Sequence, residues 1–216
     1  MTAYQAKIPL SDIKVFFFDL DNTLYPHDCG LWEVLRDRIN LFMIDQMQLP
    51  AEQVPDLRHR LWSQYGTTLR GLQAEYQVDT NAYLEYVHSL PLRDFIKPNP
   101  ALPQLLAALP QPKVIFTNSD ADHARRVLAA LKITDHFQDI IDVHIQAPHC
   151  KPQPEAFQKA LARVNERPEN CLLIDDSPDN LEAAQQLGFK TVSIGPHFHA
   201  GSPYIPTIEK LLDVIS

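Results

Sequence analysis

Short, mostly apolar runs recur along the chain. They cover residues 15–18, 113–117, 171–175 and 191–194, and a weaker run covers residues 140–143. Runs of this length without regular polar alternation are typical of strands that are buried on both faces of a parallel sheet. The pattern therefore predicts four strands of such a sheet and a weaker fifth one.

Helical patterns with recognisable starts and ends separate these runs. The boundary residues are Ser119 or Asp120 before a helix that runs to about Leu131, Pro154 at the first position of a second helix, and Ser177, Pro178 and Gly188 around a third. Strands that alternate with helices form βαβ units. The expected fold class is α/β, a Rossmann-like doubly wound parallel sheet with helices on both faces.

The long stretch between the first two predicted strands contains no convincing strand. Helical spacing covers residues 31–42, 55–65 and 80–90, and Asp79 precedes the last of these. We expect residues 25–97 to form an all-helical cap inserted after the first strand, and residues 1–24 and 98–216 to form the α/β catalytic core. Ligands of open α/β sheets bind beyond the carboxyl ends of the strands, so an insert at this place would cover the site.

Composition and charge narrow the class of protein. The chain has 216 residues, 45% of them hydrophobic, and a formal net charge of −8. An acidic protein lacks the basic surface that binds nucleic acid polymers or anionic membranes. Three cysteines without metal-ligand spacing, and the absence of a signal-like or membrane-spanning run, favour a cytoplasmic location. The sequence makes no prediction of an oligomeric state.

Polar clusters follow the predicted strands. In chain order they are Asp19 and Asp21, then Thr117, Asn118 and Ser119, then Lys151, and finally Asp175 and Asp176. Each cluster alone has a plainer interpretation as a turn, a helix cap or a solvated lysine. Adjacent aspartates after a buried strand repel each other, however, and Mg²⁺ would relieve that repulsion.

Taken together, the clusters resemble the motifs of the haloacid dehalogenase-like superfamily. The order is an acid pair, a hydroxyl, a lysine and a second acid pair, each at a strand end, over residues 15–24 and 113–180. The resemblance implies Mg²⁺ held by Asp19, by the main-chain carbonyl of Asp21 and by the pair Asp175 and Asp176. Of that pair, Asp176 is implied as the direct ligand.

The resemblance also implies catalytic roles. Asp19 would attack phosphorus and form an aspartyl-phosphate. Asp21 would protonate the leaving oxygen and later activate water, a role that requires a carboxyl pKa raised toward the working pH. Lys151, the Thr117 hydroxyl and the Asn118 N–H would bind the phosphoryl oxygens.

A closer resemblance is to the pyrimidine 5′-nucleotidase branch of this superfamily. It is carried by residues 21–26, 65–72, 86–92 and 115–119, and by the His123-Ala124 pair. It implies a small phosphorylated metabolite as substrate, a pyrimidine nucleoside 5′-monophosphate such as UMP or CMP. Tyr25 and Arg70 are the candidate substrate contacts, because a base needs an aromatic or guanidinium surface.

Other functions fit the same motifs. A sugar-phosphate or phosphoglycolate phosphatase uses the same chemistry on other substrates, and a phosphomutase would need a cap that excludes water during the phosphoenzyme step. A phosphoacceptor signalling module and an inactive phosphate-binding protein belong to different classes. A binding protein has no need of both a nucleophile and an acid, so Asp19 and Asp21 favour an enzyme.

Overall fold

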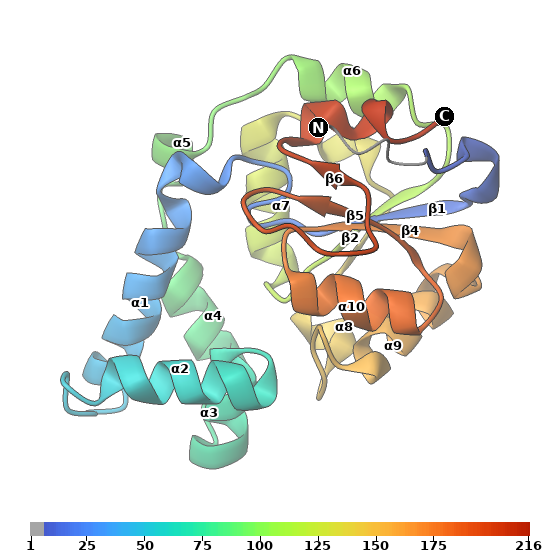
Figure 1. Ribbon diagram of the computed structural model, residues 1–216. Helices are drawn as coiled ribbons and strands as arrows, with labels where there is room; N and C mark the ends of the chain where they lie inside the picture. Colours follow the sequence, from blue (N-terminus) through green and yellow to red (C-terminus); the bar gives the residue numbers. More distant parts are fainter. Residues whose placement is uncertain (1–6) are drawn as a thin grey trace.

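The core of the protein is a six-stranded, wholly parallel sheet (Figure 1). A computed structural model describes residues 7–216, so the first six residues of the predicted core segment 1–24 lie outside the described residues. The strands are β1 (Val15–Phe18), β2 (Lys113–Phe116), β3 (Asp139–Ile141), β4 (Cys171–Asp175), β5 (Lys190–Ile194) and β6 (Tyr204–Ile205). Their order is β3-β2-β1-β4-β5-β6, which confirms the parallel sheet; the two-residue β6 was not predicted.

Helices and 3-10 turns connect the strands, and most of the helices lie between β1 and β2. The helices are α1 (Leu31–Asp45), α2 (Val54–Tyr65), α3 (Thr68–Tyr76), α4 (Thr80–His88), α5 (Leu92–Phe95), α6 (Ala101–Ala107), α7 (Ala121–Leu131), α8 (Val143–Gln146), α9 (Pro154–Val164) and α10 (Pro178–Gln186). The 3-10 turns are η1 (Leu10–Asp12), η2 (His27–Cys29), η3 (Thr134–His136), η4 (Pro168–Asn170) and η5 (Ile208–Asp213). None of the helices in residues 7–216 has the length and apolarity needed to cross a lipid bilayer.

Both faces of the sheet are covered by helices. Successive side chains of a strand point to opposite faces. Phe17 accordingly packs in one cluster with Phe157 of α9 and Leu181 of α10, whereas Phe18 packs in another with Val127 of α7. The predicted doubly wound fold is therefore confirmed, and its buried strands explain why the sequence shows unbroken apolar runs.

Local signals place the helix starts. The Asp120 side chain accepts from the His123 N–H at 2.8 Å and caps α7, and Pro154 opens α9, as predicted. The weak fifth strand ends earlier than expected. Asp142 accepts from the N–H groups of His144 and Ile145, which starts helix α8 at residue 143.

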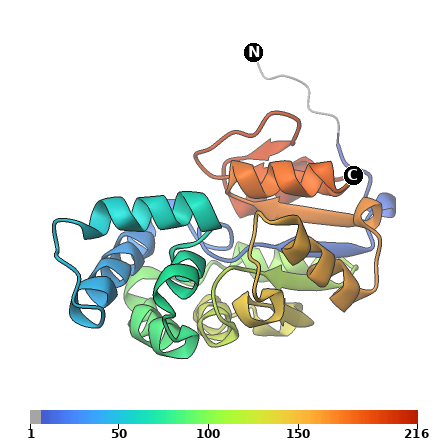
Figure 2. The same ribbon diagram turned by 90° about the horizontal axis from the view of Figure 1, so that it is seen from below.

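The chain between β1 and β2 forms helices and loops, without a strand, across residues 19–112. We call residues 31–95, with α1 to α5, the helical segment; it stands to one side of the sheet (Figures 1 and 2). Helix α3 was not predicted, because Gly66 and Gly71 interrupt its helical spacing. A Cβ on Gly71 would lie 2.6 Å from the Leu61 Cβ, so this glycine permits α2 and α3 to pack closely.

Candidate active site

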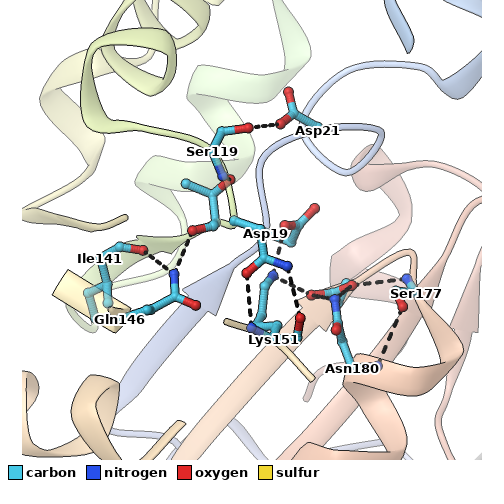
Figure 3. A network of polar contacts seen from close by, with 11 residues as sticks. Asp19, Asp21, Ser119, Ile141, Gln146, Lys151, Ser177 and Asn180 are labelled. Carbon is cyan, nitrogen blue, oxygen red and sulfur yellow. Dashed lines mark hydrogen bonds and ion pairs between the residues drawn. The ribbon is translucent and has the colours of Figure 1, made fainter. Parts of the chain in front are cut away.

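The carboxyl ends of β1 and β4 and the loop before α9 meet at one edge of the sheet. Lys151 lies between two carboxylates there, with its Nζ 2.8 Å from Asp19 Oδ1 and 2.7 Å from Asp175 Oδ2 (Figure 3). Lys151 is 1% exposed and Asp175 is fully buried. A buried ion pair that is broken on one side leaves a costly unpaired charge, so the three groups hold one another in place.

Besides Lys151, the Asp175 carboxylate accepts hydrogen bonds from the start of α10, the helix that follows β4. Its Oδ1 accepts from the Ser177 N–H at 2.9 Å, and Asn180 Nδ2 lies 2.9 and 3.1 Å from its two oxygens. Ser177 and Asn180 belong to the first turn of α10 and its cap. Asp175 is thus an anchor between Lys151 and α10, while Asp176 is the more accessible member of the pair.

Negative charge is in excess at this edge. Oxygen atoms of Asp19, Asp175 and Asp176 lie within 4.8 Å of one another. Burial and the charges of Asp175 and Asp176 raise the pKa of Asp19 well above its usual value, although Lys151 opposes that rise. Burial and the Asp175 charge likewise raise the pKa of Asp176 to about 7. For Lys151, burial alone would lower the pKa, but Asp175 and Asp19 raise it.

These residues fit a divalent cation. When all of them are ionised, three carboxylates face one ammonium group, which leaves two negative charges uncompensated. Mg²⁺ prefers oxygen ligands and is commonly bound through one or two carboxylates. Of the four predicted metal ligands, the structure gathers the side chains of Asp19, Asp175 and Asp176, whereas the Asp21 side chain turns elsewhere.

The loop with Lys151 is fastened to the end of β2. Asn118 Oδ1 accepts from the Lys151 N–H at 2.9 Å, and Asn118 Nδ2 donates to the Lys151 carbonyl at 3.0 Å. The Asn118 side chain therefore positions Lys151. The predicted phosphate contact of its main-chain N–H stays a prediction.

Thr117 directly follows β2, at the same edge of the sheet. The hydroxyl oxygen accepts from the Ser119 N–H at 3.0 Å. This bond uses an oxygen lone pair and leaves the hydroxyl hydrogen available to a ligand. The predicted phosphate contact of Thr117 is therefore compatible with its hydrogen bonding.

Asp21 lies in a different environment from Asp19. Its carboxyl group meets the Tyr25 hydroxyl at 2.7 Å, the Ser119 hydroxyl at 2.8 Å and His123 Nε2 at 3.0 Å. Burial alone would raise the pKa of Asp21, but the His123 charge and these hydrogen bonds lower it well below its usual value. The expectation of a raised pKa is therefore wrong for the protein without substrate, because three neighbours stabilise the carboxylate form.

Tyr25 was predicted to contact a substrate, and the structure gives it another task. It is 3% exposed, and its hydroxyl donates to Asp21. Burial and the Asp21 charge raise the pKa of Tyr25, which keeps the hydroxyl protonated as a donor. Tyr25 is buried behind Asp21 and orients that carboxyl group.

Arg70 was the second predicted substrate contact, and it links two parts of the chain. Its guanidinium donates to the Val143 carbonyl at 2.6 Å and to the His149 carbonyl at 2.8 and 3.1 Å, and it also donates to Gln73. Its exposure is 7%. The structure therefore favours a role for Arg70 in fastening α3 to the loop before Lys151.

Three polar neighbours of Asp21 and Asp176 were not among the predicted site residues. Ser119 and His123 follow β2 and contact Asp21, and Asn22 partly lowers the pKa of Asp176, which burial raises. His123 carried a detectable signal, since it lies in the first turn of a helix that starts beside the end of β1. A buried histidine in such a turn is a candidate partner for a strand-end carboxylate.

Known proteins resemble this chain over most of its length. The family model of haloacid dehalogenase-like hydrolases matches residues 13–188. Phosphate metabolism protein 8 of Saccharomyces cerevisiae is 31% identical over 192 residues, which are 81% of this chain and 59% of that protein. This chain thus spans about three fifths of the length of that relative.

Solved structures show the same fold at low identity. The HAD-hydrolase YfnB of Bacillus subtilis, bound to magnesium, has 19% identity and a TM-score of 0.63, with 94% of this chain and 98% of that chain covered. CbbY of Rhodobacter sphaeroides, in complex with phosphate, has 17% identity and a TM-score of 0.67, with 92% and 96% covered. At this level of identity the likeness concerns the fold.

Proposed function

The chain belongs to the haloacid dehalogenase-like hydrolases, and we propose that it is a Mg²⁺-dependent phosphomonoesterase that acts through an aspartyl-phosphate on Asp19. One observation carries the proposal. Lys151 joins Asp19 to Asp175, and the carboxylate oxygens of Asp19, Asp175 and Asp176 lie close enough together to hold one metal ion. The substrate we propose is a nucleoside 5′-monophosphate of the UMP or CMP type.

The Asp19 carboxylate is arranged for attack on phosphorus. Lys151 bonds to Oδ1, and Oδ2 has no hydrogen-bond partner among residues 7–216. Oδ2 would form the new bond to phosphorus while the ester oxygen leaves. Mg²⁺ would be held by Asp19, the Asp21 carbonyl and Asp176. Its positive charge would offset the repulsion between the Asp19 carboxylate and the phosphate dianion.

Asp21 would handle the proton. The ester oxygen leaves as an alcohol once it receives a proton from Asp21, and the resulting carboxylate then takes a proton from the water that hydrolyses the aspartyl-phosphate. A phosphate dianion placed beside Asp19 puts like charge near Asp21, which raises its pKa. The bound substrate itself would thus favour the protonated acid over the ionised form of the free protein.

Phosphoryl chemistry is favoured over dehalogenation by the presence of Asp21. A halide leaves without a proton, so a dehalogenase needs no acid at that place. Signalling and binding modules are disfavoured, since the match to a hydrolase family covers residues 13–188. Two alternatives stay open. A sugar-phosphate or phosphoglycolate phosphatase differs in its substrate, and a phosphomutase differs in passing the phosphoryl group to a second substrate oxygen instead of to water.

The helical segment is the part we propose for substrate selection. The proposal divides the chain into a core of residues 1–24 and 98–216 and a cap of residues 25–97. It is supported by the helical character of α1 to α5 and by the place of the segment directly after β1. A cytoplasmic location stays a prediction from the cysteine count.

Phosphate release from a panel of monophosphates tests the function. The panel contains UMP, CMP, AMP, phosphoglycolate and hexose phosphates, each assayed with Mg²⁺ and with EDTA. We expect hydrolysis in the presence of Mg²⁺ and none in EDTA, and we expect UMP or CMP to be hydrolysed fastest. Faster hydrolysis of phosphoglycolate or a hexose phosphate would replace the proposed substrate, and full activity in EDTA would contradict the metal requirement.

A further inference from the structure

Two buried histidines from distant parts of the chain stack on each other. His88 is the last residue of α4 in the helical segment, and His123 lies in the first turn of α7. Their ring centroids are 4.2 Å apart and the ring planes differ by 23°. His123 is fully buried and His88 is 8% exposed. The stack is therefore a contact between the helical segment and the α/β core.

His123 is held at one edge by a single hydrogen bond. Its Nε2 lies 3.0 Å from Asp21 Oδ1, and its Nδ1 has no hydrogen-bond partner among the described residues. The carboxylate accepts, so Nε2 carries the donated hydrogen. A ring fixed by one bond can still swing about it, so the packing on its faces decides how firmly it holds Asp21. His88 provides that packing on one face.

His88 is itself fixed by α7. Its Nδ1 bonds to Asp120 Oδ2, and its carbonyl accepts from Arg126 at 2.8 Å. Asp120 also caps α7 through the His123 N–H. The two rings are thus tied to the same helix end, and the arrangement requires α4 to lie against α7.

We propose that His88 is a positioning residue for Asp21 and acts through the stacked ring of His123. The proposal rests on the proposed function, because it assigns the residue that supports the acid–base carboxyl group of that reaction. When α4 lies against α7, the His88 ring confines His123, and His123 confines Asp21 beside the leaving oxygen. Contact of the helical segment with α7 therefore also places Asp21 for proton transfer.

The His88 side chain can be shortened to alanine without leaving a closed cavity. His88 lines an open cleft of about 660 Å³ between α4 and the starts of α7 and α8, together with Ser89, Asp120 and Arg126. Removal of the ring next to such a cleft admits water and leaves no sealed cavity. We therefore expect His88→Ala to fold, which circular dichroism and a thermal melt check directly.

Two esters of similar shape separate positioning of the acid from other roles. Phenyl phosphate and p-nitrophenyl phosphate differ mainly in how much their leaving oxygen needs a proton. The ratio kcat/KM reports steps up to formation of the phosphoenzyme, so it is unaffected by slow phosphoenzyme hydrolysis. For His88→Ala with Mg²⁺ we expect a loss of about tenfold on phenyl phosphate and about twofold or less on p-nitrophenyl phosphate.

Matched variants define which property of His88 matters. His88→Phe keeps a ring over His123 and should restore most of the phenyl phosphate activity. Glu85→Ala removes an exposed side chain from the same helix and the same cleft, and should leave the ratio of the two esters unchanged. In an Asp21→Asn background, His88→Ala should add no further selectivity, since two residues that act as a unit are not additive.

Failure of the proposal differs from failure of the proposed function. Equal losses of His88→Ala on both esters, or a His88→Phe variant as selective as the alanine variant, would overturn the positioning role while the phosphatase stands. A wild-type protein that hydrolyses neither ester with Mg²⁺ would overturn the proposed function, and the positioning role with it.

Discussion

Two buried cations, one in the α/β core and one in the helical segment, have opposite surroundings. Lys151 lies between the carboxylates of Asp19 and Asp175, at 2.8 and 2.7 Å. Arg70 donates mainly to the neutral carbonyls of Val143 and His149. The pKa of Lys151 is raised by its carboxylate partners, although burial opposes this, whereas burial lowers the pKa of Arg70.

The two surroundings indicate that Lys151 acts through its charge and Arg70 through the geometry of its hydrogen bonds. A cation between carboxylates changes the electrostatics of the group that attacks, so its positive charge is the property that matters. A guanidinium on main-chain carbonyls fixes distances, because its planar array of donors reaches the start of α8 and the loop after it at once. We therefore expect the core to determine the chemistry and the helical segment to determine how the core residues are placed.

The largest expected effect comes from the core cation. Lys151→Met removes the positive charge beside Asp19 and should lower kcat/KM for p-nitrophenyl phosphate by roughly 10³. Assays with saturating Mg²⁺ and a thermal melt separate lost chemistry from lost folding. Lys14→Met is the control, since Lys14 forms an exposed ion pair of 4.0 Å with Glu166 and should behave like wild type. A Lys151→Met variant within tenfold of wild type would contradict the distinction between the two cations.

The next largest effect concerns the acid. Asp21→Asn should lower kcat/KM by on the order of 10² for phenyl phosphate and by much less for p-nitrophenyl phosphate, whose leaving oxygen needs little protonation. The asparagine keeps the size of the side chain. Its oxygen can still accept from Tyr25, and its NH₂ group can donate to the Ser119 hydroxyl oxygen. Equal losses on the two esters would argue against the acid role of Asp21.

A smaller effect is expected from the cation of the helical segment. Arg70→Met leaves the carbonyls of Val143 and His149 without their donor, and should reduce the free energy of unfolding by about 1–3 kcal/mol. Activity should fall by less than about tenfold and equally for both esters, since no proton transfer is touched.

The exposed Arg60 of α2 provides the control for Arg70. It pairs with Glu75 at 2.7 Å on the surface, and Arg60→Met should change the free energy of unfolding much less than Arg70→Met does, because water screens this exposed pair. Denaturant unfolding of both variants measures the difference. An Arg70→Met variant that retains full stability but has a KM raised a hundredfold would instead assign Arg70 to substrate binding.

The smallest effect is a pH dependence of metal binding. Protons and Mg²⁺ compete for Asp176, whose pKa is raised to about 7. The affinity for Mg²⁺ should therefore weaken as the pH falls below about 7, by up to about tenfold per pH unit. In the metal-free protein the same raised pKa means that Asp176 contributes a loss of stability as pH rises from about 4 to about 7. Titration calorimetry at several pH values measures the first effect, and an affinity independent of pH would contradict it.

The sequence was informative where a short-range rule applies. Asp19, Thr117 and Asp175 each come at or directly after a buried strand, and parallel strands end at one edge, so their meeting could be predicted. The extents of β1 and of β4 were also predicted correctly, because each strand coincides with an apolar run in the sequence. Membership of a pyrimidine 5′-nucleotidase branch stays a prediction, because the family match concerns the broader hydrolase family.

Contacts between the helical segment and the core could not be predicted in this way. Arg70 and His149 are 79 positions apart, and His88 and Asp120 are 32 apart. No periodicity relates such residues, since the packing of separate helices decides which side chains meet. For this reason Arg70 was expected at a substrate, whereas the structure shows it bonded to main-chain carbonyls of the core.

The most direct test of the account is the identity of the phosphorylated atom. The enzyme is mixed with Mg²⁺ and p-nitrophenyl phosphate, quenched within one turnover and reduced with borohydride, which converts an aspartyl-phosphate to homoserine. Peptide mass spectrometry then locates the modified residue. We predict homoserine at position 19, and no steady-state turnover by Asp19→Asn. Modification at another residue, or sustained hydrolysis by Asp19→Asn, would contradict the assignment of Asp19 as the nucleophile.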